Sequence, residues 1–299
     1  MLADFSTLEK NVKSMKGIAV AVAAAGDTHT IEAIKELREH VDARCYLVGD
    51  SAKIGEECEK LSMDSRNIEI ISGDDEIDAA KKAVALCRDG KAGILMKGLM
   101  QTSNLLKAVL DKENGIRKGG LMSHLAVLES PSYHKLMFIT DGGMNPFPDF
   151  SQKQAILENT VDFMKKLGYG CPNIAALAAV ETVSEKMPET VDAAKLTQMS
   201  ADGEITGCII EGPLSFDLAI SRESADIKGA DIKIAGETDV FLVPNISTGN
   251  IMTKALMYLG GAKMAGCVLG AQVPIVLTSR GATAEEKLFS FFLCQLGSV

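Results

Sequence analysis

The sequence predicts an α/β protein made of two α/β/α domains, each with a mainly parallel sheet. Short apolar runs of strand length alternate with segments of helical periodicity along most of the chain, which is the signature of βαβ units. The 299 residues suffice for two domains of ordinary size. Hydrophobic residues make up 46% of the chain and aromatic residues only 5%, so the cores must be mainly aliphatic.

Four βα units fill the first third of the chain. The expected strands are 18–24, 45–48, 68–71 and 93–96, and a helical segment follows each of them. Turn residues such as Gly26-Asp27 and Gly49-Asp50 separate strand from helix. Two further strand candidates, 121–129 and 135–140, are joined by a hairpin-like connection that predicts an antiparallel excursion.

The βα alternation resumes in the second half. Ser151 and Gln154 have the spacing of a capping box and open a helix to about residue 167. The remaining expected strands are 174–180, 208–210, 240–243, 266–269 and 274–278, and Thr283-x-x-Glu286 caps a last helix. We therefore assign residues 1–142 and 271–299 to a first domain and residues 143–270 to a second.

Composition and charge exclude several classes of partner. The net charge of -9 leaves no excess of Lys and Arg for nucleic acid or anionic lipid. No apolar run reaches the roughly 20 residues that span a bilayer, and the N-terminus has neither a signal-peptide nor a transit-peptide pattern. The seven cysteines are scattered without a Cys-x-x-Cys pair, which favours reduced, buried thiols over a catalytic cysteine. We expect a cytoplasmic protein that binds small molecules.

Several catalytic motifs are missing from the sequence. There is no Walker A motif, and no Gly-x-Gly-x-x-Gly follows an expected strand, so ATP and dinucleotide binding lack support. The four histidines are too dispersed for a metal-ligand pattern, and neither His-Glu-x-x-His nor Gly-x-Ser-x-Gly occurs. We expect no metal site.

Polar clusters do stand at the C-terminal ends of expected strands, where ligands bind in open parallel sheets. Each combines small residues, which permit close backbone approach, with a hydrogen-bond donor. The clusters are Lys97–Thr102, Thr140–Pro146, Glu211–Pro213, Pro244–Asn250 and Thr278–Gly281.

These strings, in this order, resemble the phosphate acetyl/butyryltransferase family over nearly the whole chain, and its butyryl-type branch in particular. The matching motifs are Met96-Lys97-Gly98-Leu99, Met122-Ser123-His124-Leu125-Ala126-Val127, Thr140-Asp141-Gly142, Glu185-Lys186-Met187-Pro188, Gly212-Pro213-Leu214, Pro244-Asn245-x-x-x-Gly249-Asn250 and Val276-Leu277-Thr278-Ser279-Arg280.

The resemblance implies a fold like that of the isocitrate and isopropylmalate dehydrogenases, with the active site in the interdomain cleft, and a homodimer. It implies direct transfer of an acyl group between coenzyme A and phosphate in a ternary complex, without metal or organic cofactor. The butyryl-type motifs favour butyryl or a short branched acyl group, and acetyl remains the alternative.

Ser279 and Arg280 match the family's catalytic Ser-Arg pair. A guanidinium can grip two phosphate oxygens at once, and a serine hydroxyl can stabilise the developing oxyanion by on the order of 3 kcal/mol. The other interpretation of this pair is a strand-to-helix turn with a solvated arginine.

The general base is less defined by the resemblance. The carboxylate of acetyl-type relatives falls on Glu286, while butyryl-type relatives often carry an acid at the position of Ala282. Glu286 also completes the Thr283 capping box, Glu285 is a weaker candidate, and Arg280 with the helix N-terminus can activate the thiol instead.

Further candidate substrate contacts lie in the polar clusters and in the helix after the first of them. Asn and Asp also end strands for conformational reasons, and Lys107 can equally lie on a solvated helix face. The candidates are Lys97, Gly98, Thr102, Lys107, Asp141, Asn145, Asn245 and Asn250.

Two other functions remain as alternatives. A decarboxylating dehydrogenase would need an aspartate cluster and a nicotinamide site, and the sequence offers neither. A non-catalytic sensor of coenzyme A or acyl phosphate is kept open by the missing acid at Ala282. Coenzyme A would stabilise such a sensor without any phosphate-dependent release of thiol.

Overall fold

The computed structural model describes residues 2–279 and 281–298. By the density of its contacts the chain forms two compact units. The terminal unit comprises Phe5–Gly120 and residues 265–298, and the central unit comprises residues 2–4 and Leu121–Met264. Each unit has its own strands and its own helices.

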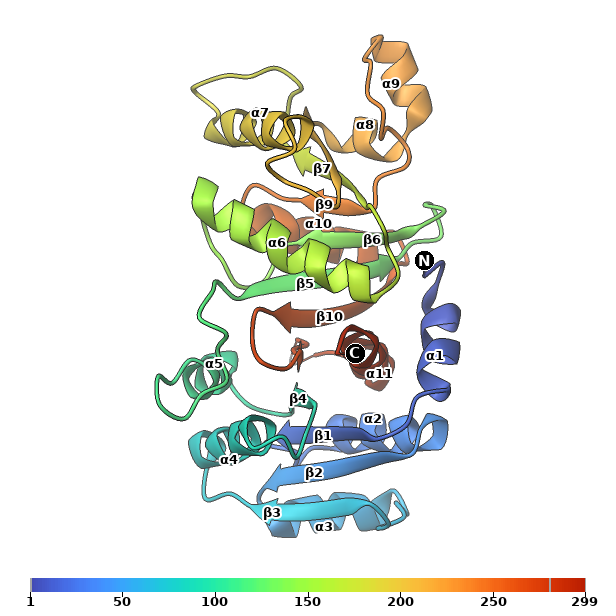
Figure 1. Cartoon of the computed structure of the whole chain (residues 1–299). Coiled ribbons are helices and arrows are strands. Elements are labelled where there is room, and N and C mark those ends of the chain that lie inside the picture. The colour runs from blue at the N-terminus through green and yellow to red at the C-terminus, as the bar shows by residue number, and fades with distance from the viewer. Residues whose placement is uncertain (1, 280, 299) are drawn as a thin grey trace. The chain divides into compact units, whose positions relative to one another are not determined.

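The sheet of the terminal unit has the strand order β3-β2-β1-β4-β11-β10 (Figure 1). All neighbouring pairs are parallel except β10 and β11, which are antiparallel. The strands are β1 (Ile18–Ala23), β2 (Ala43–Gly49), β3 (Ile68–Ser72), β4 (Ile94–Lys97), β10 (Lys263–Leu269) and β11 (Ile275–Val276).

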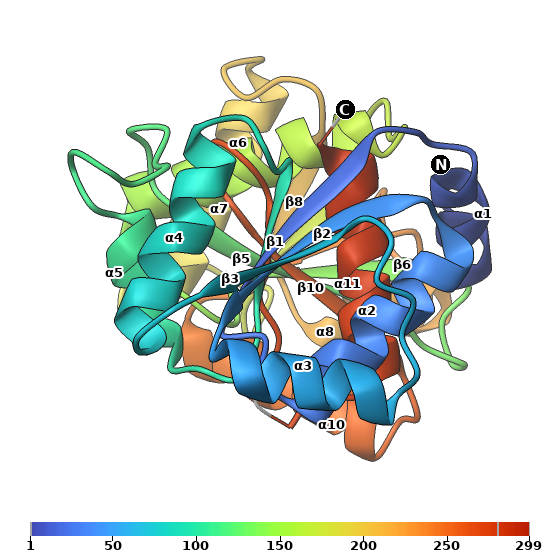
Figure 2. The same cartoon turned by 90° about the horizontal axis from the view of Figure 1, so that it is seen from below.

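Helices cover both faces of this sheet (Figure 2). Helices α4 and α5 lie on one face, and α2, α3 and α11 lie on the other. The helices are α1 (Phe5–Lys13), α2 (Thr28–His40), α3 (Ser51–Lys60), α4 (Glu76–Arg88), α5 (Thr102–Val109) and α11 (Ala284–Gly297). Aspartates at 27, 50 and 75 cap α2, α3 and α4 by accepting backbone N–H groups, which fixes where each helix begins.

The sheet of the central unit has the order β5-β6-β9-β7-β8. Strands β5 and β6 form an antiparallel hairpin, and the remaining pairs are parallel. The strands are β5 (Ser123–Glu129), β6 (Leu136–Thr140), β7 (Asn173–Leu177), β8 (Ile209–Leu214) and β9 (Val240–Leu242).

The central sheet is also covered on both faces. Helices α6 and α7 pack on one face, while α8 and α10 cover the other and bury a core around Phe241. The helices are α6 (Phe150–Lys166), α7 (Pro188–Ala201), α8 (Phe216–Ile220), α9 (Arg222–Lys228) and α10 (Ile246–Tyr258).

The predicted fold class is confirmed, including the antiparallel excursion, but the predicted start of α6 is wrong by two residues. Asp149, not Ser151, is the N-cap, and its capping-box partner is Gln152. Asp149 has extended backbone dihedrals and accepts the Gln152 N–H at 2.8 Å, while the Ser151 hydroxyl donates to Asp149 at 2.7 Å. A carboxylate two residues upstream therefore takes the capping position that the Ser151 pattern suggested.

The compact units divide after Gly120 and after Met264, whereas the sequence analysis divided the domains after residues 142 and 270. Strands β5 and β6 pair with each other and β6 pairs with β9, so the hairpin stays whole in the central unit. Most of β10 belongs to the terminal unit, where it pairs with β11.

All seven cysteines are free, and five of them are buried. Burial raises the pKa of the Cys45 and Cys87 thiols to about 12, so both behave as small apolar side chains. Within residues 2–279 and 281–298, no helix is both long and apolar enough to cross a bilayer.

Candidate active site

Three loops of the terminal unit meet at the C-terminal edge of its sheet, because β1, β4 and β11 are parallel neighbours. The backbone N–H groups of Gly98 and Leu99 donate to the carbonyls of Ala23 and Ala24 at 2.8 and 3.0 Å. A Cβ atom on Gly98 would lie 2.2 Å from the Ala24 oxygen, so this close approach requires glycine. The glycine expected to contact substrate therefore also joins the β1 and β4 loops.

Lys97 ends β4 as a buried side chain. Its ammonium donates to the carbonyl oxygens of Gly98 and Met100, both at 3.2 Å. These bonds fold the loop around the ammonium and fix a positive charge at the end of the strand. The structure thus gives the predicted substrate contact a second role in shaping its own loop.

Thr102 and Lys107 lie on α5, which is tied to α4 through Glu76. The Glu76 carboxylate accepts hydrogen bonds from the Gln101 backbone at 3.2 Å and the Asn104 amide at 3.0 Å. Lys107 lines a groove of about 570 Å³ between α4 and α5. Four cations and a single carboxylate are among the residues of this groove, namely Lys81, Lys82, Arg88, Lys107 and Asp111. Such a lining suits a ligand that carries several phosphate charges.

Ser279 is exposed in the turn that follows β11. Its hydroxyl oxygen accepts the Gly281 N–H at 3.4 Å, and its carbonyl accepts the Ala282 N–H at 3.1 Å. The turn thus leads directly into α11 and leaves the hydroxyl hydrogen available for another acceptor. Arg280, the other half of the predicted catalytic pair, lies outside the described residues.

The capping box predicted at the start of α11 is confirmed. The Glu286 carboxylate accepts the Thr283 N–H at 2.8 Å, and the Glu286 N–H donates to the Thr283 hydroxyl at 3.1 Å. One carboxylate oxygen of the candidate base is therefore already engaged. Ala282 is buried, so its methyl group belongs to the packing of the turn.

In the central unit, Asp141 organises the loop that follows β6. One of its oxygens accepts the N–H groups of Gly143 and Met144, both at 2.8 Å. The other accepts the His124 N–H at 3.1 Å and the Asn145 amide at 2.6 Å. The side chain is 2% exposed, so a residue expected to contact substrate serves as the acceptor that holds its own loop.

His124 was not a predicted site residue, yet it lies beneath this loop. Its ring is buried, and Nδ1 has no hydrogen-bond partner among the described residues. Burial lowers the pKa of the imidazole, and the nearby Asp141 carboxylate opposes that effect. A Cβ atom on Gly143 would lie 2.6 Å from the His124 Cγ, so the loop backbone packs directly against the ring.

The start of α10 packs against the same loop and brings the other two asparagines to it. Asn245 caps α10 by accepting the Thr248 N–H at 3.0 Å, and the Asn250 amide donates to the Gly142 carbonyl at 3.5 Å. A Cβ atom on Gly249 would lie 2.7 Å from the Gly142 Cα. Asp141, Asn145, Asn245 and Asn250 are thus brought together at one edge of the central sheet.

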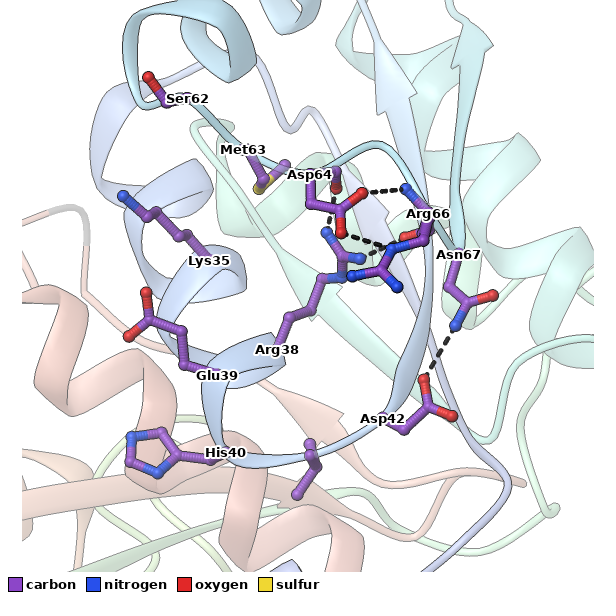
Figure 3. Close-up of a pocket in the computed structure, with 11 residues that line it drawn as sticks. Lys35, Arg38, Glu39, His40, Asp42, Ser62, Met63, Asp64, Arg66 and Asn67 are labelled. Carbon is purple, nitrogen blue, oxygen red and sulfur yellow. Dashed lines mark hydrogen bonds and ion pairs between the residues drawn. The ribbon is translucent and has the colours of Figure 1, made fainter.

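Another groove, of about 680 Å³, lies at the opposite edge of the terminal sheet, beside the starts of β2 and β3 (Figure 3). The cations drawn there already have partners. The Arg38 guanidinium donates to the carbonyls of Asp64 and Arg66, and Lys35 donates to the Leu61 carbonyl at 3.0 Å. Arg66 pairs with the Asp64 carboxylate at 2.6 Å. In the groove of Lys107, Lys82 and Arg88 also have ion-pair partners, whereas Lys81 and Lys107 have none among the described residues, so that groove is the better candidate for an anion.

No group of three or more His, Cys, Asp or Glu side chains in the described part of the chain could hold a metal ion. Besides His124, the sequence analysis also missed Lys287 and Asp27 as parts of the terminal-unit edge. Helical periodicity offered a signal for Lys287, because it shares the buried face of α11 with Phe291 and Cys294.

Comparisons with known proteins agree on one family. Residues 75–294 match the family described as phosphate acetyl/butaryl transferase. The chain is 41% identical over 296 residues to a phosphate butyryltransferase of Clostridium acetobutylicum. The aligned residues cover 99% of this chain and 98% of the relative.

Solved structures show the same likeness. A branched-chain phosphotransacylase from Enterococcus faecalis V583 has a TM-score of 0.84 and 32% identity, covering 94% of this chain and 99% of that one. A 4-hydroxythreonine-4-phosphate dehydrogenase from Klebsiella pneumoniae shares the fold alone, with a TM-score of 0.56 and 12% identity over 95% of this chain and 100% of that one.

Proposed function

Because the chain belongs to the phosphate acetyl/butaryl transferase family, we propose that it catalyses acyl-CoA + phosphate = acyl phosphate + CoA. The observation that carries this proposal is the end-to-end likeness to a phosphate butyryltransferase. The proposed acyl group is butyryl or a short branched chain, which the names of that relative and of the branched-chain phosphotransacylase support. Acetyl is the alternative within the same family.

The proposed transfer is direct. A phosphate oxygen attacks the thioester carbonyl carbon, the carbonyl oxygen gains negative charge, and the carbon–sulfur bond breaks to release the CoA thiolate. Ser279 donates its hydroxyl hydrogen to the developing oxyanion, a role that its exposed position in the turn supports. Arg280 grips two oxygens of the phosphate and directs the third toward the carbonyl.

In the reverse direction the CoA thiol must lose a proton, because the thiolate is the nucleophile. We assign this proton to Glu286. Its hydrogen bond with the Thr283 N–H holds the carboxylate at the start of α11, in the segment that follows the Ser279 turn. The positive end of α11 stabilises the same thiolate.

The remaining substrate contacts follow from charge and place. Lys107 and the other cations of its groove hold the phosphates of CoA. Lys97, Gly98 and Thr102, which lie at the two ends of the loop between β4 and α5, are the neighbouring substrate contacts. Asp141, Asn145, Asn245 and Asn250 supply polar groups from the central unit. Replacing Lys107 with Ala should therefore raise KM for acyl-CoA more than KM for phosphate. CoA and phosphate act as substrates, and the reaction requires no cofactor.

We further propose a cytoplasmic homodimer. Free thiols support a reducing compartment. Helix α10 and the residue after it expose Ile251 (68%), Tyr258 (78%) and Leu259 (89%), and apolar exposure of this kind supports an interface with a second copy. Light scattering should give a dimer mass for the wild type and a monomer mass for the double variant Ile251→Glu/Leu259→Glu. Ile227→Glu, at an equally exposed site on α9, should stay dimeric.

The experiment that tests the function measures thiol release from acetyl-, butyryl- and isobutyryl-CoA with and without phosphate. Wild type is compared with Arg280→Ala and with Arg44→Ala, a control at an exposed surface ion pair. We expect phosphate-dependent release that favours butyryl or isobutyryl chains, is lost in Arg280→Ala and is kept in Arg44→Ala. Stabilisation by CoA without any release would instead favour the sensor function, for which the apolar Ala282 is the supporting observation.

A further inference from the structure

In the described part of the terminal unit, three polar side-chain groups without a direct partner belong to neighbouring segments. Lys287 on α11 is 5% exposed, and its ammonium has no direct hydrogen bond or ion pair among the described residues. Asp27 accepts the Thr30 N–H at 3.0 Å with one oxygen, whereas its buried Oδ2 has no partner. The buried Thr30 hydroxyl is also unpartnered.

The fold brings these groups to the edge that carries Ser279. Asp27 lies in the loop after β1, and β1, β4 and β11 are consecutive strands of the sheet. Helix α11, which begins just after the Ser279 turn, packs against α2, the helix that Asp27 caps. The Lys287 N–H donates to the Thr283 carbonyl at 3.2 Å, so Lys287 closes the first turn of α11.

We infer that the charges of Lys287 and Asp27 attract each other across the contact between α11 and α2 and thereby position the Ser279 turn for acyl transfer. This inference rests on the proposed function. Three carboxylates act on the charge of the Lys287 ammonium, namely Asp27 from the β1 loop, Glu286 from α11 itself and Glu32 from α2. Glu286 is already engaged in its capping box, and Asp27 has the free buried oxygen.

Buried charges such as Lys287 and Asp27 are better suited to positioning the Ser279 turn than to raising the free energy of unfolding. Burial lowers the pKa of Lys287, because a charged ammonium is less favourable away from water. The negative charge of Asp27 is the largest influence that raises this pKa again. A buried ion pair adds little stability over an apolar pair of the same size, but it demands a defined geometry. Here the attraction between Lys287 and Asp27 draws the start of α11 toward the β1 loop, and hence sets the direction of the turn that presents Ser279.

The test is a double-mutant cycle of Lys287→Met, Asp27→Asn and the double variant, with Lys135→Met as control. Lys135 pairs with the nearly buried Asp239 at 2.7 Å, at the other edge of the central sheet. Each single variant should lower kcat by about 10- to 100-fold while KM for both substrates changes little, because small misplacement is costly in the transition state. The double variant should be no slower than the worse single variant. Lys135→Met should lower the denaturation midpoint and keep kcat.

Three results would overturn the inference while leaving the function intact: full kcat in Lys287→Met, losses that multiply in the double variant, or an equal loss of kcat in Lys135→Met. The same cycle measured by urea denaturation midpoints needs no activity, and independent effects there would also overturn the pair. A wild type without phosphate-dependent thiol release would instead remove the reaction, and the positioning role with it.

Discussion

The two units present different kinds of polar edge. In the terminal unit, Ser279 is exposed, and the cations of the Lys107 groove far outnumber its carboxylates. In the central unit, the nearly fully buried Asp141 accepts three hydrogen bonds from its own loop and a fourth from the His124 N–H on β5. Polar residues that follow strands thus serve different purposes in the two units. We expect variants of the first edge to change kinetics and variants of the second to change stability.

The largest effect that separates the two edges is expected for Asp141→Ala. Removing the carboxylate leaves buried N–H groups of Gly143, Met144 and His124 without an acceptor, and each such group costs about 1–3 kcal/mol. The free energy of unfolding should fall by at least about 3 kcal/mol. Urea denaturation measures this loss, and a stability near that of the wild type would show that the loop does not depend on Asp141.

Ser279→Ala is the matched change at the terminal edge. We expect kcat to fall by about 10² to 10³-fold, the loss typical of a missing oxyanion donor. The free energy of unfolding should stay within about 0.5 kcal/mol, because the exposed hydroxyl has only one long hydrogen bond. Steady-state kinetics and urea denaturation on the same sample decide between the two effects. A destabilised but fully active variant would contradict the assignment.

Glu286 has a proposed role as general base and an observed role in the capping box of α11, and two substitutions separate these roles. Glutamine also completes a capping box, so Glu286→Gln keeps the cap and removes the basic carboxylate. If Glu286 takes the thiol proton, Glu286→Gln should slow acyl-CoA synthesis by about 100-fold or more at unchanged stability. Glu286→Ala should additionally lose about 1 kcal/mol of stability. An active Glu286→Gln variant would leave Glu286 with the cap alone and assign thiol activation to Arg280 and the helix N-terminus.

The smallest expected effect concerns the pH dependence of the central unit. Burial lowers the pKa of His124 in the folded state below the 6.5 of a free imidazole. As the pH falls through that value, the unfolded chain binds a proton that the folded chain does not, so stability decreases. His124→Phe should lose less stability than the wild type between about pH 7.5 and 5.5. His29→Gln, at an exposed ring, should behave as the wild type does, and equal slopes in all three proteins would contradict the assignment.

Much of the fold was predictable because hydrophobic periodicity reports which residues face a core. The alternation predicted the strands, the hairpin of β5 and β6, and the edge at which the polar loops gather. Local spacing also predicted the Thr283 capping box, since that motif is closed within four residues. The same spacing failed at Ser151, because Asp149 was the better acceptor two residues earlier.

The detail of the candidate site was less predictable, for a physical reason. Residue type tells that Asp141 can accept hydrogen bonds, but not that its own loop and β5 will supply four donors. Helical periodicity likewise places Lys287 on the buried face of α11, but does not tell that this helix packs against α2. Such pairings depend on where separate segments meet in space, and a single sequence does not encode that meeting in any local pattern.

The central prediction is acyl transfer between butyryl-CoA and phosphate. Wild-type protein mixed with butyryl-CoA and phosphate can be followed by phosphorus NMR for butyryl phosphate and by a thiol reagent for free CoA. We predict that the two products appear together in equal amounts, with neither formed when phosphate is omitted. Release of CoA without butyryl phosphate, or no release at all, would contradict the acyl transfer on which the roles of Ser279, Arg280 and Lys287 depend.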